Sequence, residues 1–295
     1  MPIPVLRTSL ISRLLLLAAG VAAISSAAVM IKQTDAPALT IAFYRMFISA
    51  AVIWPFYLAR PERLSHPVHR STAIVGGIFL AAHFALWITS LKYTSVANSL
   101  ILVTMNPIFV GIGSVWILRE KTSVLLILGT SLSIAGCSAL LLGDVTSTQT
   151  NLEGNLLALA GAVGMSGYML VGRKVRRDVA LIPYVAWVYG VAALVLGAIC
   201  VMTGTSLLPG NADVFLRLLL IALIPQVLGH TTINWVLRYV PPSYVAVVIL
   251  LEPVLGSLMA YWILSESVTM WTAVGGTLVL SGIVTALAKP AESTK

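Results

Sequence analysis

The chain has 295 residues, of which 59% are hydrophobic and only 9% are charged, and its mean hydropathy is +0.98. Soluble domains carry about 25% charged residues, so this composition excludes a soluble enzyme, a nucleic-acid-binding protein and a disordered protein. The formal net charge of +8 would suggest nucleic acid in a soluble protein, but in a membrane protein it indicates basic residues in cytoplasmic loops. We therefore predict an all-α integral membrane protein with several spans.

Ten apolar stretches are long enough to cross a hydrocarbon core of about 30 Å as helices. In chain order they are residues 14–31, 37–59, 72–91, 95–117, 123–142, 154–172, 183–203, 214–236, 243–264 and 270–288. The links between them are short and carry Pro, Gly, Asn or Ser, so no loop could hold a soluble domain. Arg7 and Arg13 before the leucine run at 14–17 also resemble a signal peptide, an alternative that the repeat described below disfavours.

The basic residues predict the orientation of these spans. If the N-terminus is cytoplasmic, only Lys32, Lys92 and Arg217 lie outside, and Arg45 lies within a span. The inner ends and loops then hold Arg7, Arg13, Arg60, Arg63, Arg70, Arg119, Lys121, Arg173, Lys174, Arg176, Arg177, Arg238, Lys289 and Lys295. Because cytoplasmic loops are enriched in Lys and Arg, we expect a multi-pass protein of the cell inner membrane with both termini cytoplasmic.

The two halves of the sequence repeat one another. At a shift of 146, residues 91–136 align without a gap, and at a shift of 141 an earlier stretch aligns as well. The matches are Leu91-Lys92-Tyr93 with Leu237-Arg238-Tyr239, Pro107 with Pro253, Trp116-Ile117-Leu118 with Trp262-Ile263-Leu264, Glu120 with Glu266, Gly129 with Gly275, Leu132 with Leu278, Gly136 with Gly282, Gly20 with Gly161, Ser25 with Ser166, and Lys32 with Arg173. Five spans per copy is an odd number, so the second copy enters from the opposite side. We predict two inverted five-helix repeats, at 14–143 and 154–288, a design common in secondary transporters.

The fourth and ninth predicted spans, with their internal prolines and the motifs that end them, resemble those of a known family. Asn106-Pro107 and Glu252-Pro253, with the Trp-Ile-Leu-x-Glu motifs after them, resemble the drug/metabolite transporter superfamily, in particular its EamA-type branch with two EamA repeats. The symmetry of the two halves predicts alternating access, because exchanging their conformations turns an outward-open state into an inward-open one. The resemblance implies a central cavity lined mainly by spans 1–4 and 6–9, with spans 5 and 10 peripheral. The chain departs from that pattern at Ser25-Ser26, where many members have a Trp. It also lacks the first-span Glu of the small multidrug relatives, since residues 14–31 contain no acid.

Two charged residues fall near the middle of the membrane, where a charge costs about 2.5–3.5 kcal/mol on insertion scales. Arg45 lies eight residues past Pro37, about 12 Å deep, and Glu252 lies nine residues past Ser243, about 14 Å deep. Either they tie helices together, with each other or with the backbone, or they face the cavity and bind a zwitterion. In the second interpretation Arg45 holds a carboxylate and Glu252 holds an amine or a proton.

Other polar and aromatic residues within the spans are candidates for the same cavity. Gln226, His230 and Asn234 follow one another at intervals of four, which predicts one helix face, and His83 and Trp87 have the same spacing. Asn106 and Glu252 each precede a proline, so we expect both helices to bend beside the cavity, unless these are packing kinks. The complete set of predicted substrate-binding residues is Arg45, His83, Trp87, Asn106, Tyr168, Trp187, Gln226, His230, Asn234 and Glu252.

The function that fits best is a secondary transporter, an exporter of small polar metabolites such as amino acids. No cofactor or metal is expected, because the two cysteines, Cys137 and Cys200, lie in apolar stretches and no ATP-binding or metal-ligand motif occurs. The expected partners are a small-molecule substrate and the lipid bilayer; coupling to protons and a homodimer stay open. The alternatives are an intramembrane enzyme or a non-transporting membrane scaffold, but a scaffold would not need Arg45 and Glu252 buried, and we predict that the chain is not an enzyme.

Overall fold

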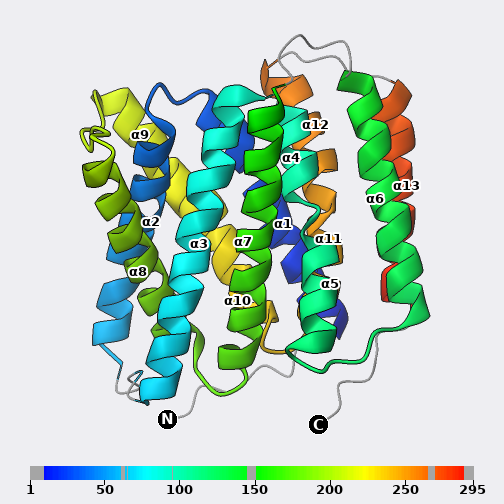
Figure 1. Ribbon diagram of the computed structural model, residues 1–295, viewed down its shortest axis with the longest axis horizontal. Helices are drawn as coiled ribbons and strands as arrows, with labels where there is room; N and C mark the ends of the chain where they lie inside the picture. Colours follow the sequence, from blue (N-terminus) through cyan, green and yellow to red (C-terminus); the bar gives the residue numbers. More distant parts are fainter. Residues whose placement is uncertain are drawn as a thin grey trace.

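The computed structural model describes residues 10–60, 64, 66–94, 96–144, 151–264 and 270–288. Within these ranges the chain is helical, with no β-strand (Figure 1). Several residues used in the orientation and repeat arguments lie outside the described residues: Arg7, Arg63, Glu266, Lys289 and Lys295.

The helices follow the predicted spans. The first half contains α1 (Leu10–Lys32), α2 (Ala38–Leu58), α3 (Pro67–Tyr93), α4 (Val96–Val103), α5 (Asn106–Trp116) and α6 (Val124–Asp144). The second half contains α7 (Leu152–Arg176), α8 (Leu181–Met202), α9 (Ala212–Ile221), the π-helix η1 (Ala222–His230), α10 (Thr231–Val236), α11 (Pro242–Ile249), α12 (Leu251–Leu264) and α13 (Met270–Leu287).

Among the described residues, eight helical stretches are long and apolar enough to cross a membrane. Two shorter apolar stretches, Val124–Ala139 in α6 and Ala273–Leu287 in α13, coincide with the predicted fifth and tenth spans. The chain is therefore a multi-pass helical membrane protein, and the total of ten spans stays a prediction.

Two spans are interrupted where the intramembrane prolines occur. The fourth predicted span divides into α4 and α5 just before Pro107, and the ninth divides into α11 and α12 just before Pro253. Proline has no N–H to donate to the preceding turn and its ring clashes with that turn, so a helix breaks there. The predicted bends are confirmed, as breaks in the two helices.

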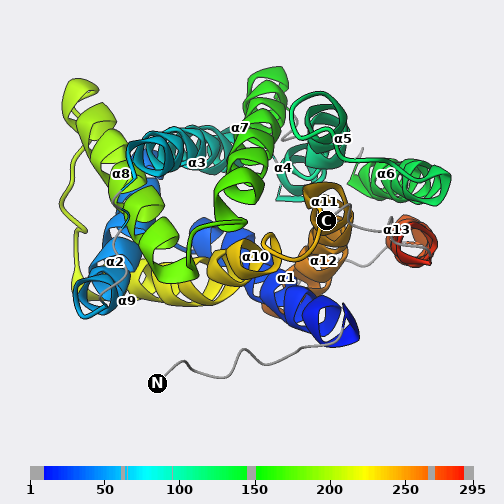
Figure 2. The same ribbon diagram turned by 90° about the horizontal axis from the view of Figure 1, so that it is seen from below.

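Seen along the helix axes, most of the helices surround the middle of the bundle, and α6 and α13 lie together at one edge (Figure 2). The most extensive helix contacts join α6 with α13, α3 with α7, and α2 with α8. The buried core is formed mainly by α1, α2, α3, α7, α8 and the segments from α9 to α11, with smaller contributions from α4, α5, α6 and α13. The edge pair α6 and α13 packs against α4, α11 and α12 along one side of the bundle.

The α6–α13 contact is reciprocal. The close approaches are Gly129 to Gly282, Gly136 to Gly275, and Ser133 to Val279, where the Ser133 hydroxyl donates to the Val279 carbonyl at 3.2 Å. A Cβ on the α6 glycines would collide with the backbone of α13. Ser133 and Val279 are 146 residues apart, the same shift as in the sequence repeat. The glycine contact therefore occurs twice with the roles of the copies exchanged, and the Ser133–Val279 contact corresponds to itself, as a two-fold axis between these two residues requires.

Candidate functional site

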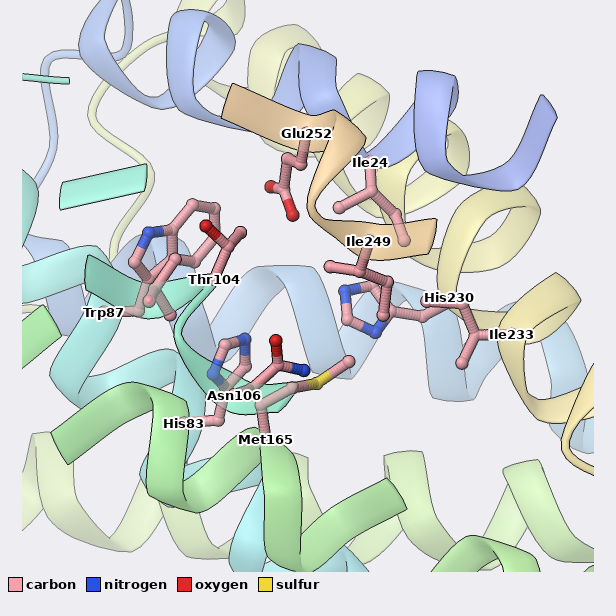
Figure 3. A pocket seen from close by; sticks show the side chains of 11 residues that line it. Ile24, His83, Trp87, Thr104, Asn106, Met165, His230, Ile233, Ile249 and Glu252 are labelled. Atoms are coloured by element: carbon pink, nitrogen blue, oxygen red, sulfur yellow. The ribbon is translucent and has the colours of Figure 1, made fainter. Parts of the chain in front are cut away.

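A pocket lies in the interior, beside the breaks between α4 and α5 and between α11 and α12 (Figure 3). Its walls are formed by Ile24, His83, Trp87, Val103, Thr104, Asn106, Met165, His230, Ile233, Ile249 and Glu252. Its empty volume is about 350 Å³ counted to its open edge, but much less of that space is wide enough for a water molecule. The walls are therefore close together in this conformation.

Five of the predicted site residues line this pocket: His83, Trp87, Asn106, His230 and Glu252. The rings of His83 and Trp87 stack with centroids 5.8 Å apart and planes 8° apart, and the His83 and His230 centroids are 6.4 Å apart. The Nδ1 of His83 donates to the carbonyl of Gly161 at 2.9 Å, which fixes the ring against α7. The pocket therefore combines aromatic surface with a few polar groups, as is usual for small-molecule sites.

Glu252 supplies the only acidic group among the pocket-lining residues of the described chain, and no Lys or Arg lines the pocket. It occupies the first turn of α12, directly after the helix break, and its carboxylate points into the pocket (Figure 3). The residue is only 5% exposed. Because the break before Pro253 fixes where α12 begins, it also determines the depth at which this acid enters the pocket.

Arg45 lies one layer behind the pocket wall. It is fully buried, its Nε donates to Oε1 of Gln226 at 2.9 Å, and its guanidinium lies 4.1 Å above the ring of Phe84. Its two terminal nitrogens have no hydrogen-bond partner within the described residues, and it forms no ion pair with Glu252 there. A salt bridge between Arg45 and Glu252, one of the two interpretations from sequence, is therefore absent from this conformation.

The three polar residues of the eighth predicted span are all buried, but they have different partners. His230 lines the pocket, Gln226 contacts Arg45, and the Nδ2 of Asn234 donates to the Tyr168 hydroxyl and to the His230 carbonyl. Residues from Ala222 to His230 form a π-helix, and Asn234 follows in α10. The span therefore contributes one of its three polar residues to the pocket, and the other two form hydrogen bonds to neighbouring helices.

Trp187 lies away from the pocket. Its Nε1 donates to the Tyr57 hydroxyl at 3.3 Å, and the guanidinium of Arg70 lies 5.7 Å from its ring. The sequence reasoning, in turn, did not include six lining residues, Ile24, Val103, Thr104, Met165, Ile233 and Ile249. Three of them, Val103, Thr104 and Ile249, flank the helix breaks and could have been found by that adjacency. The other three are indistinguishable in sequence from ordinary core residues.

A cluster of charged groups joins three segments at one end of the bundle. Oε1 of Glu120 accepts hydrogen bonds from Nε of Arg173 at 2.9 Å and from Nη2 of Arg177 at 2.8 Å. The Nη1 of Arg173 also donates to the carbonyls of Leu237 and Arg238, at 2.9 and 3.0 Å. We call these five residues the Glu120 latch, because they connect the ends of α5, α7 and α10. Elsewhere in the described chain, no group of three or more His, Cys, Asp and Glu residues could hold a metal ion.

Comparison with known proteins places these features in a family. The sequence profile of the EamA-like transporter family matches residues 11–142 and again residues 152–288. The chain belongs to the EamA-like transporter family. It is 23% identical over 257 residues to an uncharacterized transporter of Archaeoglobus fulgidus, covering 84% of this chain and 87% of the relative. It is 22% identical to the uncharacterized transporter YyaM of Bacillus subtilis, covering 73% of this chain and 72% of the relative.

The fold is also found among solved structures. A crystal structure superposes with a TM-score of 0.78 at 21% identity, covering 94% of this chain and 98% of the other. At that identity the likeness concerns the fold alone. The family and the names of the relatives indicate a membrane transporter rather than an enzyme.

Proposed function

We propose that this protein is a secondary transporter that exports small polar metabolites, such as amino acids, by alternating access. The observation that carries the proposal is Glu252, which enters a closely fitted interior pocket at a helix break and has no ion-pair partner among the residues that the structure describes. Behind the same wall, two guanidinium nitrogens of the buried Arg45 have no hydrogen-bond partner within the same residues. Opposite charges that are buried near one another, yet not bonded to one another, suit a ligand that carries both signs.

In this proposal the substrate amine binds Glu252, and its carboxylate reaches Arg45 when the pocket widens. The ring of Phe84 lies against the guanidinium and is 5.3 Å from the ring of His230, which lines the pocket. Movement of Phe84 would open Arg45 to the ligand. A buried donor without a partner costs about 1–3 kcal/mol, so a carboxylate that accepts from both free nitrogens would recover that loss.

The proposed transport cycle uses two inverted repeats, residues 14–143 and 154–288, with ten spans and both termini in the cytoplasm. The reciprocal α6–α13 contact supports the inverted relation. In the Glu120 latch, Arg173 donates to the backbone near Leu237; its partner in the repeat, Lys32, donates to the Thr94 carbonyl at 3.5 Å at the other end. We infer that the Glu120 latch closes one entrance to the pocket, that the contact between Lys32 and Thr94 helps to close the other, and that the two entrances open in turn.

Proton coupling is part of the proposal, because the pocket holds groups that can carry a proton. Glu252, His83 and His230 all line it, within reach of one bound ligand. A substrate amine and a proton would then compete for Glu252, which is a direct way to exchange one for the other across the inner membrane.

The test is transport by purified protein in proteoliposomes with labelled amino acids, nucleosides and organic cations. We expect uptake of amino acids, loss of it in Glu252→Gln and Arg45→Lys, and normal uptake in the control Glu153→Gln, an exposed acid at the start of α7. Arg45→Lys keeps the charge but loses the planar pair of donors. Amino-acid transport that is unaltered in Glu252→Gln or Arg45→Lys would overturn the site, and transport of none of the amino acids would overturn the substrate class.

A further inference from the structure

The polar atoms that face the interior pocket are mostly hydrogen-bond acceptors. Glu252 offers a carboxylate, and Asn106 offers its amide oxygen, which has no hydrogen-bond partner within the described residues. Figure 3 shows both groups directed toward the middle of the pocket. The hydroxyl of Thr104, another lining residue, donates its hydrogen to the Leu100 carbonyl at 2.7 Å and keeps only its lone pairs. A ligand that satisfies these atoms must therefore supply hydrogen-bond donors.

Contacts with α7 fix the roles of Asn106 and His83. The Nδ2 of Asn106 donates to the Met169 sulfur at 3.5 Å, so the amide oxygen is turned the other way. The Nδ1 of His83 lies 2.9 Å from the Gly161 carbonyl, which can only accept, so this nitrogen carries the hydrogen. A neutral imidazole has one N–H, so the Nε2 of His83 is an acceptor, and this ring lines the pocket. Three acceptors with defined roles therefore come from α3, α5 and α12.

The donors near the pocket are placed less favourably. The indole nitrogen of Trp87 has no partner within the described chain, but it lies on the edge of its ring that is farthest from the middle of the pocket (Figure 3). His230, whose Nδ1 also has no partner there, can accept as well as donate. The free nitrogens of Arg45 lie behind the wall. Acceptors therefore predominate among the groups that face the pocket.

Charge and size narrow the ligand further. Glu252 is the only acid among the lining residues of the described chain and no Lys or Arg lines the pocket, so a cation is favoured. Little of the pocket is wide enough for a group as large as a water molecule. A primary ammonium group is of that size, whereas a trimethylammonium group is much larger. The primary ammonium also carries three N–H donors, one for each of Glu252, Asn106 and His83.

We propose that the pocket selects a primary ammonium group, which donates one hydrogen bond each to Glu252, Asn106 and His83, and that it discriminates against N-methylated amines. The inference rests on the proposed function for the amine at Glu252, and it adds Asn106 and His83 as residues that determine specificity. An aromatic cage would give the opposite order. The rings of His83 and Trp87 stack beside the pocket, and aromatic cages bind quaternary ammonium groups by cation–π attraction.

The test measures how well butylamine and its N-methyl, N,N-dimethyl and N,N,N-trimethyl derivatives protect a pocket thiol from a neutral methanethiosulfonate reagent. The protein is the purified full chain with Met165→Cys in the pocket wall and with the buried Cys137 and Cys200 replaced by alanine. We expect the affinity to fall about tenfold with each methyl group, because a hydrogen bond to a charged group contributes at least that much. Equal affinity across the series, affinity that rises with methylation, or no protection by butylamine would overturn the proposal.

Two pocket variants test the assigned acceptors. Asn106→Leu removes one acceptor at similar size, so butylamine should bind about tenfold more weakly and no better than its N-methyl derivative. His83→Phe keeps a ring against Trp87 but lacks Nε2; it should have the same effect and stands in if Asn106→Leu does not fold. Asn155→Leu is the control, because that amide lies outside the pocket and accepts from the Thr94 hydroxyl at 2.9 Å. Methyl selectivity that both pocket variants retain in full would refute the assignment.

These binding measurements use no gradient, no liposome and no carboxylate. A failure here would leave transport of amino acids by the protein untouched. A failure of the transport assay would, in turn, leave the methyl selectivity of the pocket as measured. The outcome for the ammonium site is therefore separate from the outcome for the proposed function.

Discussion

Neutralising Glu120 should open the pocket to the membrane face at which the Glu120 latch lies. Arg173 is 6% exposed and Glu120 14% exposed, so their hydrogen-bonded ion pair is largely shielded from water. A hydrogen bond to a charged group contributes about 1.5–3 kcal/mol. Arg177 is 49% exposed, and its bond to the same oxygen adds at most about 0.5 kcal/mol. Because glutamine can still accept one hydrogen bond, we expect Glu120→Gln to remove about 2 kcal/mol, which is about thirtyfold in the closed-to-open ratio.

The assay measures how fast a thiol in the pocket reacts with a membrane-impermeant reagent. Met165→Cys places the thiol in the pocket wall, and the two native cysteines, which are buried, are first replaced by alanine. With the reagent on the latch side, Glu120→Gln should raise the labelling rate by up to about thirtyfold. Asp213→Asn breaks an exposed ion pair outside the latch and should leave the rate unchanged.

Arg173→Lys separates the charge of the latch from its geometry. Lysine keeps the positive charge but cannot hold the Glu120 carboxylate and the carbonyls of Leu237 and Arg238 together as the guanidinium does. We expect faster labelling in this variant too. If both variants label at the parent rate while their thermal unfolding is unchanged, the latch does not hold the entrance closed and the reasoning is wrong.

Three further predictions concern orientation and packing. In intact cells an impermeant thiol reagent should label Leu208→Cys and not Asp178→Cys; the reverse would invert the predicted topology. Tyr168→Phe removes the hydroxyl that accepts from a buried asparagine amide, so thermal unfolding should show a loss of about 1–3 kcal/mol, and an unchanged melting temperature would contradict the bond. Gly136→Leu should prevent α13 from docking and abolish monodisperse protein in size-exclusion chromatography, whereas Gly111→Leu, which meets open space, should be tolerated; equal behaviour would exclude close packing at that glycine.

Those parts of the site where a single residue alters the geometry of its helix could be predicted from sequence. Pro107 and Pro253 each remove a backbone donor in the middle of a span, so the breaks, and with them Asn106 and Glu252 at the pocket, could be predicted from the chain alone. The position of Met165 in the pocket wall could not be predicted in this way. A membrane span is apolar on its lipid side, in the core and in a cavity wall alike, so an apolar residue does not reveal which of these it faces.

The layer behind the pocket was not predictable, because it depends on tertiary contacts. The depth of Arg45 follows from its distance to the span end, but its separation from the pocket follows from Phe84, a residue with no polar signal. Gln226 lies in the π-helix η1, and its contact with Arg45 joins two helices that are far apart in the sequence, which spacing along one helix cannot predict.

The π-helix η1 also limits how closely the two repeats can adopt each other's conformation during a transport cycle. At the shift of 146, Pro225 in η1 corresponds to Phe79 in α3, and α3 is a continuous α-helix there. If the cycle exchanges the conformations of the two copies, the exchange cannot be exact, because Pro225 restricts one copy and nothing equivalent restricts the other. Unequal restraints give states of unequal free energy, so we expect the two closed states of the pocket to be unequally populated.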